Sequence, residues 1–378
     1  MISKTVGLVI SLTIIISLSI IAVVNWWPKN IGSPSEFFVG VEFAYSGNLN
    51  DVKSLVDKAK DYTNLFVIGA IEISFNKTIL DNSCDYIVDS GLYLIVFFTK
   101  SDDPNYTYVT SNWMTEAKQK YGNKLVGVYR YDEPGGNQLD LGDSLLVNEK
   151  ESYTIMSAKY ANYLGLIINT YLGYIDTVIT ADYGLYWFDY KAGYTAILTE
   201  FGWNHSRPLH IGLCRGAAEA YNKDWGAIIT WEYTEDPYIE SPEELYDDLV
   251  LAYKNGAKYA VVFDYPKIGK YGTLTDEHFN KLKEFWDYIN SNPQEHGAIQ
   301  GEVAYVLPKD YGFGFRYPED KIWGWWEADD LSPKVWNDVN TLLDQYGSHL
   351  DIVYDEPELN DVLKNRYGKL FFWNQTII

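Results

Sequence analysis

The sequence has little of what metal and thiol chemistry needs. Of its 378 residues only 2 are cysteine and 5 are histidine, and it contains no His-Glu-x-x-His or Cys-x-x-Cys pattern, so it predicts no zinc site and no disulfide framework. Cys84 and Cys214 are compatible with one bridge or with none. Nucleophile-elbow, Walker and dinucleotide-binding glycine motifs are also missing. We expect no cofactor, while the many acidic residues leave a carboxylate-bound Ca²⁺ open.

Basic residues are scarce as well. The chain has 30 Lys and Arg against 52 Asp and Glu, a formal net charge of -22. A nucleic-acid surface needs clustered Lys and Arg, so the composition argues against that partner. Aromatic residues are abundant, with 33 Tyr and 13 Trp. Because an aromatic ring covers the apolar face of a sugar, this composition favours a carbohydrate ligand, although most of these rings are expected in the core.

The N-terminus carries a long uncharged run. Val6–Val24 comprises 19 apolar or small residues, about the length that crosses a bilayer as a helix. Lys4 precedes the run and two tryptophans follow it, which predicts the short tail inside and the acidic bulk outside. We therefore predict a transmembrane signal anchor at 1–27 and a linker at 28–36, with the chain single-pass in the cell membrane and extracellular. A cleaved signal peptide is the alternative, although its apolar run is normally shorter.

Asn-x-Ser/Thr triplets fit this extracellular location. They begin at Asn76, Asn105, Asn204 and Asn374. Each triplet is weak evidence alone, so only together with the anchor do they predict a glycoprotein.

From Phe37 onward, short apolar runs alternate with amphipathic stretches, which is typical of β/α units. Helices are predicted between the runs, for example at Asn50–Tyr62, Asn112–Tyr121, Glu151–Tyr163 and Glu243–Asn255, the last with a capping box from Ser241 to Glu244. Eight such units predict a (β/α)₈ TIM barrel over 37–292, with a doubly wound open sheet as the alternative. The predicted strands are Phe38–Phe43, Leu65–Ala70, Leu92–Phe98, Leu125–Tyr131, Thr177–Ala181, Thr195–Glu200, Ala227–Glu232 and Tyr259–Asp264.

The alternation continues after the expected eighth helix, Asp276–Ile289. It predicts a small three-stranded, flavodoxin-like α/β domain over 300–378, with helices beginning at Ser332 and near Glu358. Its glycine- and aromatic-rich runs, 312–315 and 323–326, fit a sugar-binding surface or, preferably, loop and interface packing. The predicted strands are Val303–Leu307, Leu350–Tyr354 and Leu370–Trp373.

Acidic residues recur at the C-terminal ends of the predicted barrel strands, where the functional side chains of this architecture gather. Crowded acids raise one another's pKa values, so that a carboxylic acid and a carboxylate coexist near neutral pH. Glycoside hydrolysis needs such a pair. The acids at the strand ends are Glu42, Glu72, Asp132, Glu133, Asp182, Glu200, Glu232 and Asp264.

Two of these motifs resemble the barrel glycoside hydrolases of clan A. Asp132-Glu133-Pro134 follows the fourth strand, and Thr230-Trp231-Glu232-Tyr233 stands at the seventh. The resemblance implies Glu133 as the general acid/base and Glu232 as the nucleophile of a retaining hydrolase. In that clan an Asn stands where this chain has Asp132. The appended domain is similar to one that some β-galactosidases of the clan carry.

Substrate-binding residues are expected around this pair. Trp187 is a further candidate for stacking on sugar, with core packing as the alternative. We predict a membrane-anchored hydrolase of envelope or environmental glycans; the alternative is a catalytically inactive barrel that binds glycans or packs into the cell envelope. A Glu133–Glu232 carboxyl separation of about 5 Å would favour the retaining enzyme. The predicted binding residues are Glu42, Glu72, Arg130, Tyr131, Asp132, Asp182, Glu200, Trp203, Trp231 and Asp264.

Overall fold

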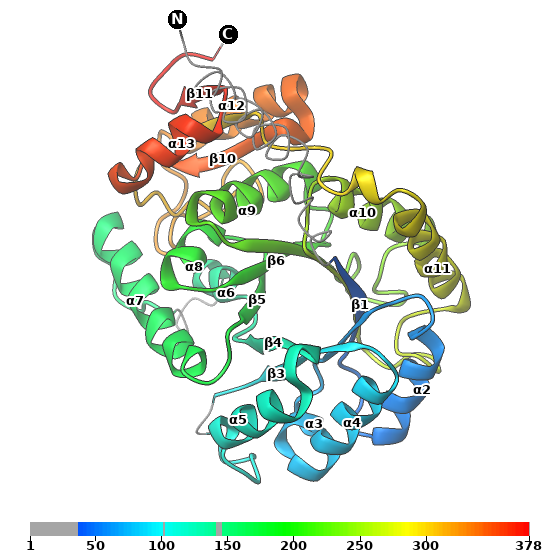
Figure 1. Ribbon diagram of the computed structural model, residues 1–378. Coiled ribbons are helices and arrows are strands. Elements are labelled where there is room, and N and C mark those ends of the chain that lie inside the picture. Colours follow the sequence, from blue (N-terminus) through cyan, green and yellow to red (C-terminus); the bar gives the residue numbers. More distant parts are fainter. Residues whose placement is uncertain (1–36, 101–102, 141–145, 378) are drawn as a thin grey trace, which may run out of the picture. The chain divides into compact units, whose positions relative to one another are not determined.

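A closed barrel of parallel strands forms the body of the molecule (Figure 1). The computed structural model describes residues 37–100, 103–140 and 146–377. Each strand pairs with its sequence neighbour and β8 pairs back to β1, so the predicted barrel is confirmed and the open sheet is excluded. The strands are β1 (Phe38–Phe43), β2 (Leu65–Ile68), β3 (Tyr93–Phe98), β4 (Leu125–Arg130), β5 (Val178–Asp182), β6 (Ala196–Phe201), β7 (Asp224–Ile229) and β8 (Tyr259–Asp264).

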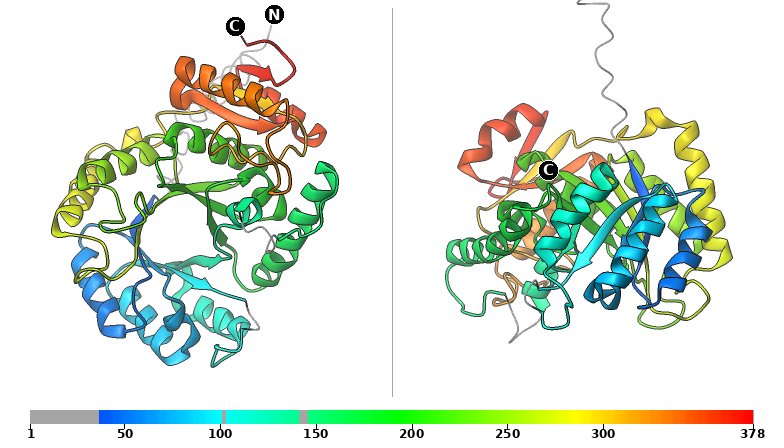
Figure 2. Two further views of the ribbon diagram at one scale, coloured as in Figure 1. Left: turned by 180° about the vertical axis from the view of Figure 1, so that it is seen from behind. Right: turned by 60° about the horizontal axis from the view of Figure 1, so that its bottom comes forward.

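Helices surround the strands as an outer ring, seen from both ends in Figures 1 and 2. The predicted capping box is present: the Ser241 hydroxyl accepts from the Glu244 N–H, and the Glu244 carboxylate accepts from the Ser241 N–H. The helices are α2 (Leu49–Ala59), α3 (Ile71–Phe75), α4 (Lys77–Asp89), α5 (Thr110–Tyr121), α6 (Pro134–Asp140), α7 (Tyr153–Leu172), α8 (Tyr186–Ala192), α9 (Arg207–Tyr221), α10 (Pro242–Lys254) and α11 (Asp276–Ser291).

The seventh strand begins and ends three residues earlier than predicted. Its apolar run continues to Trp231, but Trp231 leaves the barrel and forms an isolated antiparallel bridge with Ile239. The Glu232 N–H then donates to the Tyr238 carbonyl at 2.7 Å. The prediction that Glu232 ends the strand is therefore wrong, because the apolar run outlasts the strand pairing. Glu232 lies in the loop that follows β7.

Large side chains fill the barrel interior. Phe38 and Tyr259 stack at a centroid distance of 5.4 Å near the N-terminal end of the strands, and Phe97 meets Tyr129 edge-on at 5.0 Å nearer the other end. Buried aliphatic residues of the remaining strands, such as Leu198, pack between them. Because this interior is a packed core, a ligand site is restricted to a strand-end face.

A smaller parallel sheet of order β10-β9-β11 follows the barrel and confirms the predicted three strands. Its helix α12 carries a buried stripe that includes Val335, Val339 and Leu342. Burial of this stripe against the sheet gives the unit a core of its own. The elements are β9 (Val303–Leu307), α12 (Ser332–Tyr346), β10 (Leu350–Tyr354), α13 (Asn360–Arg366) and β11 (Lys369–Phe372).

Helix α9 joins the barrel to this sheet, beside which it lies in Figure 1. Gly212 and Gly216 are one helical turn apart, and a Cβ added at either would stand 2.7–2.8 Å from a backbone carbonyl oxygen of β10. Between them Arg215 forms an ion pair with Asp351 at 2.9 Å, and both side chains are buried. The two glycines therefore permit a close backbone approach that the ion pair fixes in register.

The aromatic runs of the appended unit serve packing. Trp323 is fully buried, its indole N–H donates to the Asp310 carbonyl at 2.9 Å, and its ring lies 4.5 Å from that of Phe188. Trp187 is also buried, between Tyr221 and Tyr354. The packing interpretation of the run 323–326 is thus confirmed for Trp323, and Trp187 is not accessible to a sugar.

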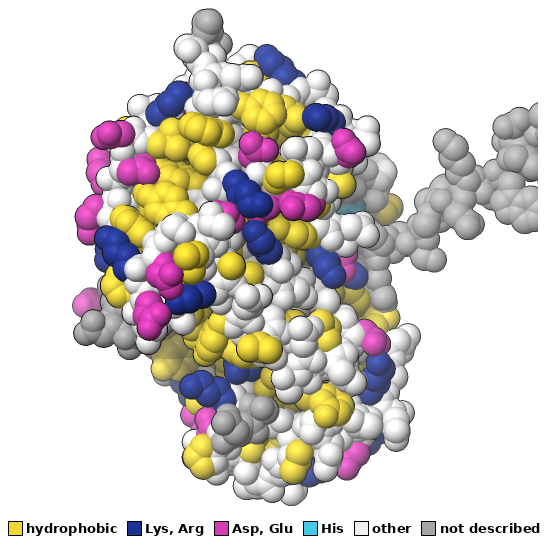
Figure 3. Space-filling model, turned by 90° about the vertical axis from the view of Figure 1, so that its left-hand side faces the viewer, with side chains coloured by type: hydrophobic (Ala, Val, Ile, Leu, Met, Phe, Trp, Pro, Cys, Tyr) yellow, Lys and Arg dark blue, Asp and Glu magenta, His cyan; other side chains and the backbone are white. Residues whose placement is uncertain are grey.

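The outer surface of α7 carries several exposed apolar side chains among polar ones. Leu166 is 75% exposed, and Ile155 and Tyr163 are exposed on the same helix. Figure 3 looks at the side that carries α7 and α13, where hydrophobic side chains gather in patches between charged ones.

Both cysteines are free and buried. The predicted anchor and linker, 1–36, lie outside the described residues, and no helix in the described part of the chain is long and apolar enough for a membrane span.

Candidate active site

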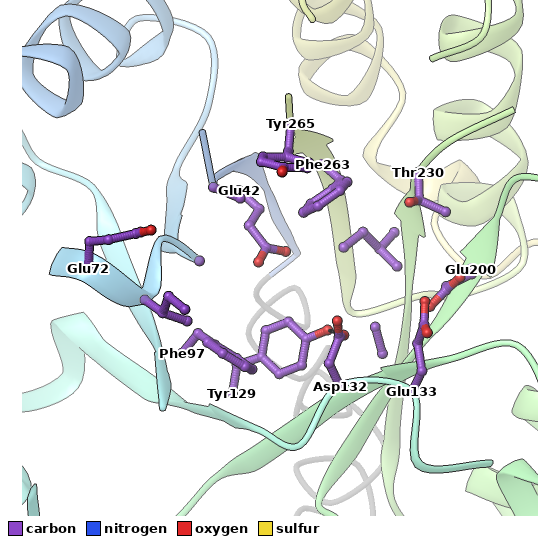
Figure 4. Close-up of a pocket in the computed structure, with 15 residues that line it drawn as sticks. Glu42, Glu72, Phe97, Tyr129, Asp132, Glu133, Glu200, Thr230, Phe263 and Tyr265 are labelled. Atoms are coloured by element: carbon purple, nitrogen blue, oxygen red, sulfur yellow. Dashed lines mark hydrogen bonds between the residues drawn. The ribbon is translucent and has the colours of Figure 1, made fainter. Parts of the chain in front are cut away.

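A cavity of about 350 Å³ opens at the C-terminal ends of the barrel strands (Figure 4). Every strand, or the residues directly after it, contributes to its wall. Phe97 and Tyr129 lie on one side and Phe263 and Tyr265 on another, with carboxyl groups between them. The wall consists of Glu42, Ala44, Gly69, Ile71, Glu72, Phe97, Tyr129, Asp132, Glu133, Ala181, Glu200, Ile228, Thr230, Phe263 and Tyr265.

The turn after β4 directs two consecutive carboxyl groups into this cavity. Tyr131 and Glu133 have φ angles of 64° and 50°, in the left-handed region that non-glycine residues rarely adopt. The Glu133 N–H donates to the Ala181 carbonyl at 3.0 Å, and the Thr180 hydroxyl donates to the Tyr131 carbonyl. Such strain persists where the surroundings impose it, commonly at functional sites. Here it brings Asp132 and Glu133 to the same wall.

Asp182, at the end of β5, holds that turn rather than the cavity. Its carboxylate accepts the backbone N–H groups of Gly135, Gly136 at 2.9 Å and Tyr183 at 2.8 Å. A Cβ at Gly135 would come within 2.3 Å of the Gly184 carbonyl oxygen, and one at Gly136 would strike the Tyr183 ring. The Gly-Gly pair after Pro134 was the sequence signal for this contact. Asp182 is fully buried and does not line the cavity. Its side chain contacts the turn, and this position does not favour its predicted role in binding substrate.

Glu133 is a protonated acid at neutral pH. Burial, together with the charges of Asp132 and Asp182, raises its pKa to about 8. Its carboxyl group shares a hydrogen bond with that of Glu200 on β6, and the two side chains point toward each other in Figure 4. Burial, and then the charge of Glu133, raise the pKa of Glu200 well above its ordinary value.

Asp132 contacts the aromatic wall of the cavity through Tyr129. Its carboxylate accepts a hydrogen bond from the Tyr129 hydroxyl, which favours the charged form, while burial raises its pKa above the ordinary value. Glu42, from β1, is buried across the cavity, and burial followed by the charge of Asp132 raises its pKa strongly. The cavity thus brings together several acids with raised pKa values and one, Asp132, whose charged form a hydrogen bond favours.

Glu232 does not line this cavity. Its carboxylate lies 3.3 Å from the guanidinium of Arg207, at the start of α9, which also contacts Glu240 at 3.1 Å and Asp248 at 2.9 Å. Burial and the charge of Asp248 raise the pKa of Glu240 to about 9. Thr230 is the polar residue that extends from β7 into the cavity. The nucleophile role of Glu232 stays a prediction, and its position does not favour it.

The other predicted binding residues fall into four groups. Glu72 lines the cavity at its exposed edge, while Trp203 and Trp231 lie beyond its wall, 6.0 Å apart. Asp264 is buried and accepts the Thr273 N–H at 2.7 Å, so it holds the loop after β8; burial raises its pKa to about 7.

Arg130 is buried outside the cavity wall. Its guanidinium lies 5.5 Å from the Tyr131 ring centroid and 5.6 Å from that of Tyr171. Arg130 and Tyr131 therefore pack together beneath the turn, and neither lines the cavity.

The aromatic wall residues were missed. Phe97 and Tyr129 both belong to predicted strands, and the strand of Tyr129 ends just before Asp132 and Glu133. Because side chains alternate between the two faces of a strand, this alternation was the signal that places Tyr129 inward. Tyr265 follows Asp264 directly and had no comparable signal. Across the described residues, no group of three or more His, Cys, Asp or Glu side chains is arranged to hold a metal ion.

The predicted glycosylation sites occupy different settings. Asn105, Asn204 and Asn374 are exposed. Asn76 is half-buried, and its side-chain oxygen caps α4 by accepting from the Thr78 and Ile79 N–H groups. Glycosylation at all four stays a prediction.

Comparison with known proteins identifies the architecture. No protein-family model and no curated protein sequence matches the chain. Among solved structures, GH5_18 from Streptomyces cattleya in complex with GlcNAc superposes with a TM-score of 0.57 at 11% identity, covering 89% of this chain and 98% of that one. A complex of the same enzyme with Manb1-4GlcNAc gives the same score. The chain shares the (β/α)₈ barrel fold of these structures.

A second match extends the comparison. Alpha-L-fucosidase isoenzyme 2 from Paenibacillus thiaminolyticus has a TM-score of 0.51 at 11% identity, covering 89% of this chain and 64% of that one. In both cases the matched share exceeds the barrel alone, so it extends into the three-stranded unit. At such low identity the likeness concerns the fold.

Proposed function

We propose that the protein is a glycoside hydrolase whose reaction takes place in the barrel-mouth cavity. The observation that carries the proposal is the strained turn after β4, which brings Asp132 and Glu133 into a cavity with further acids and aromatic walls. A sugar ring in this space meets apolar faces at Phe97 and Tyr265 and hydroxyl partners at the carboxyl groups. Its neighbours of the same fold, GH5_18 and the fucosidase, are named for sugar hydrolysis.

The acid of the reaction is Glu133. With a pKa of about 8 it carries a proton at neutral pH and can give that proton to the leaving glycosidic oxygen. Asp132 is the partner carboxylate, which stabilises the positive charge that develops on the sugar. We assign this role to Asp132 rather than Glu232 because Arg207 holds Glu232 outside the cavity wall.

Three variants test the assignment on a panel of oligosaccharides. Glu133→Gln and Asp132→Asn should each lower kcat by about a hundredfold or more, the usual contribution of a positioned acid or base. Glu232→Gln should reduce it far less. Unchanged turnover in Glu133→Gln would end the proposal, and a loss in Glu232→Gln as large as in Glu133→Gln would restore Glu232 as the nucleophile.

One observation favours a second candidate, a barrel that binds glycans without cleaving them. The cavity receives Thr230 rather than a carboxylate from the loop after β7. This candidate predicts that the parent protein binds oligosaccharides at equilibrium, that no product forms on prolonged incubation, and that Glu133→Gln leaves the affinity unchanged.

We further propose that the N-terminal run anchors the protein in the cell membrane with the barrel outside. The support is the uncharged stretch Val6–Val24 with Lys4 before it. The full chain should stay with the membrane pellet after alkaline carbonate extraction, and a form lacking residues 1–36 should not. Protection of the barrel from protease added to intact cells would contradict the outside orientation.

A further inference from the structure

A second hollow lies on the same end of the barrel as the cavity. Its volume is about 490 Å³, and it is bounded by Trp203 from the loop after β6 and by residues 232–237 from the loop after β7. Its side chains combine two exposed aromatic rings, Trp203 and Tyr233, with the acids Glu232, Glu235 and Asp236. A hollow that presents aromatic faces and hydrogen-bond acceptors has the composition of a sugar site rather than of an apolar protein contact.

The loop that forms the hollow is held in place by its own hydrogen bonds. The N–H groups of Glu232 and Tyr233 both donate to the Tyr238 carbonyl, at 2.7 and 2.9 Å, and Trp231 bridges Ile239. Arg207 fixes both ends of the loop, because it pairs with Glu232 and with Glu240. A preformed hollow binds its ligand without first ordering a loop.

A line of aromatic rings connects the hollow to the cavity. Tyr265 lines the cavity, Trp231 stacks on it at 5.9 Å and 13°, and Trp203 meets Trp231 at 6.0 Å and 72°. The Trp231 indole N–H already donates to the Tyr265 carbonyl at 2.7 Å, so its ring is fixed. The rings of Tyr265 and Trp203 are therefore no farther apart than the sum of these two centroid distances. That span is on the scale of a short run of linked sugar residues.

Trp203 is exposed in a backbone conformation that costs free energy. It has a φ of 52° and its neighbour Asn204 has 56°, both left-handed, while 36% of the Trp203 side chain faces solvent. Core packing explains neither feature. Left-handed geometry at a large non-glycine residue is retained where the position of its side chain matters.

We propose that this hollow is a second carbohydrate subsite, which binds the sugar residues that continue from the one in the cavity. The inference rests on the proposed function for the identity of the ligand. The three acids exclude uronic and sulfated chains, so the substrate class is a neutral or amino-sugar oligosaccharide that occupies cavity and hollow together. Glu232 then acts as an acceptor for sugar hydroxyls, oriented by Arg207.

The test measures chain-length dependence with manno-oligosaccharides and N-acetyl-chito-oligosaccharides of two to six units. Trp203→Ala should lower kcat/KM for the hexasaccharides about tenfold more than for the disaccharides, equivalent to about 1.4 kcal/mol. Tyr174→Ala, which removes a similarly exposed ring beyond α7, is the matched control and should leave every length unchanged. Oligogalacturonides should bind to none of these proteins.

Binding measurements separate this inference from the proposed function. Calorimetric titration of the same oligosaccharides into Glu133→Gln, with and without Trp203→Ala, reports affinity without turnover. Loss of hexasaccharide affinity on Trp203→Ala, together with no turnover of either sugar series by the parent protein, supports the subsite and overturns the hydrolase. Turnover with no length-dependent effect of Trp203→Ala overturns the subsite alone. Absence of both binding and turnover for both sugar series overturns both.

Discussion

Glu133 should lower the stability of the fold at neutral and alkaline pH, and its replacement by Gln should therefore stabilise the protein. Its pKa is about 8 in the folded state against an ordinary value of 4.5. Between these two pH values the unfolded chain has released the proton while the folded chain still holds it. The folded state then binds more protons, so the free energy of unfolding falls as pH rises from 4.5 to 8.

The size of the effect follows from the shift. Each pKa unit is worth 1.36 kcal/mol, so at pH 7 the upper limit is about 3 kcal/mol. Glu133 accepts a hydrogen bond from the Glu200 carboxyl group, and the two groups titrate together, so the part that belongs to Glu133 alone is smaller, on the order of 2 kcal/mol. Glutamine keeps the acceptor oxygen for Glu200 and does not titrate. Glu133→Gln should therefore exceed the parent in stability at pH 7 and above, and the difference should vanish at about pH 4.5.

The assay is chemical denaturation of parent and Glu133→Gln at a series of pH values from 4.5 to 8.5, alongside kcat. Glu319→Gln, on the exposed surface of the appended unit, controls for the substitution itself. A variant that is inactive and more stable at high pH supports the assignment of Glu133 as a buried acid. Equal pH dependence in parent and Glu133→Gln, or a variant that is less stable at pH 8, would refute the reasoning.

Three further outcomes follow from particular contacts. Asp182→Asn replaces one acceptor oxygen by a donor beneath the Glu133 turn, so it should cost about 1–3 kcal/mol in urea unfolding and lower kcat. Arg215→Met leaves buried Asp351 without its ion-pair partner and should cost about 3–5 kcal/mol, which Asp351→Leu in the same chain should largely recover. Gly216→Val drives a side chain against β10 and should expose the appended sheet to limited proteolysis while the barrel persists.

The barrel was predictable because its strands are buried on both faces. Such strands read as continuous apolar runs, and each helix between them supplies a separate amphipathic signal. The same property explains the error at β7: apart from Thr230 the run from Ala227 to Trp231 is apolar, and a single threonine, which strands readily accept, does not mark Ile229 as the last paired residue. Hydrophobicity reports burial, whereas a strand ends where its backbone partners end.

The candidate site was predictable only in part, for a related reason. Residues in the last positions of a strand, such as Glu42 on β1 and Glu200 on β6, reach the cavity because the parallel strands converge there. A residue three positions beyond its strand has no fixed direction: Glu133 after β4 and Glu232 after β7 both stand there, and of the two only Glu133 lines the cavity. The position of Glu232 is decided by Arg207, 25 residues earlier in the chain, and neither spacing nor motif encodes that ion pair.

The appended sheet bears on the site through the helix that both units share. It packs on α9 at Gly212 and Gly216 and is pinned by the ion pair of Arg215 and Asp351. Arg207, the first residue of the same helix, holds Glu232 and with it the loop that forms the second hollow. A buried ion pair broken on one side is costly, so a shift of α9 at its sheet contact disturbs the loop after β7 as well. The small unit therefore supports the loop after β7, which borders the second hollow at this end of the barrel. The loop with Trp323 is a further part of the small unit that packs against the barrel, and this contact is not a sugar-binding surface.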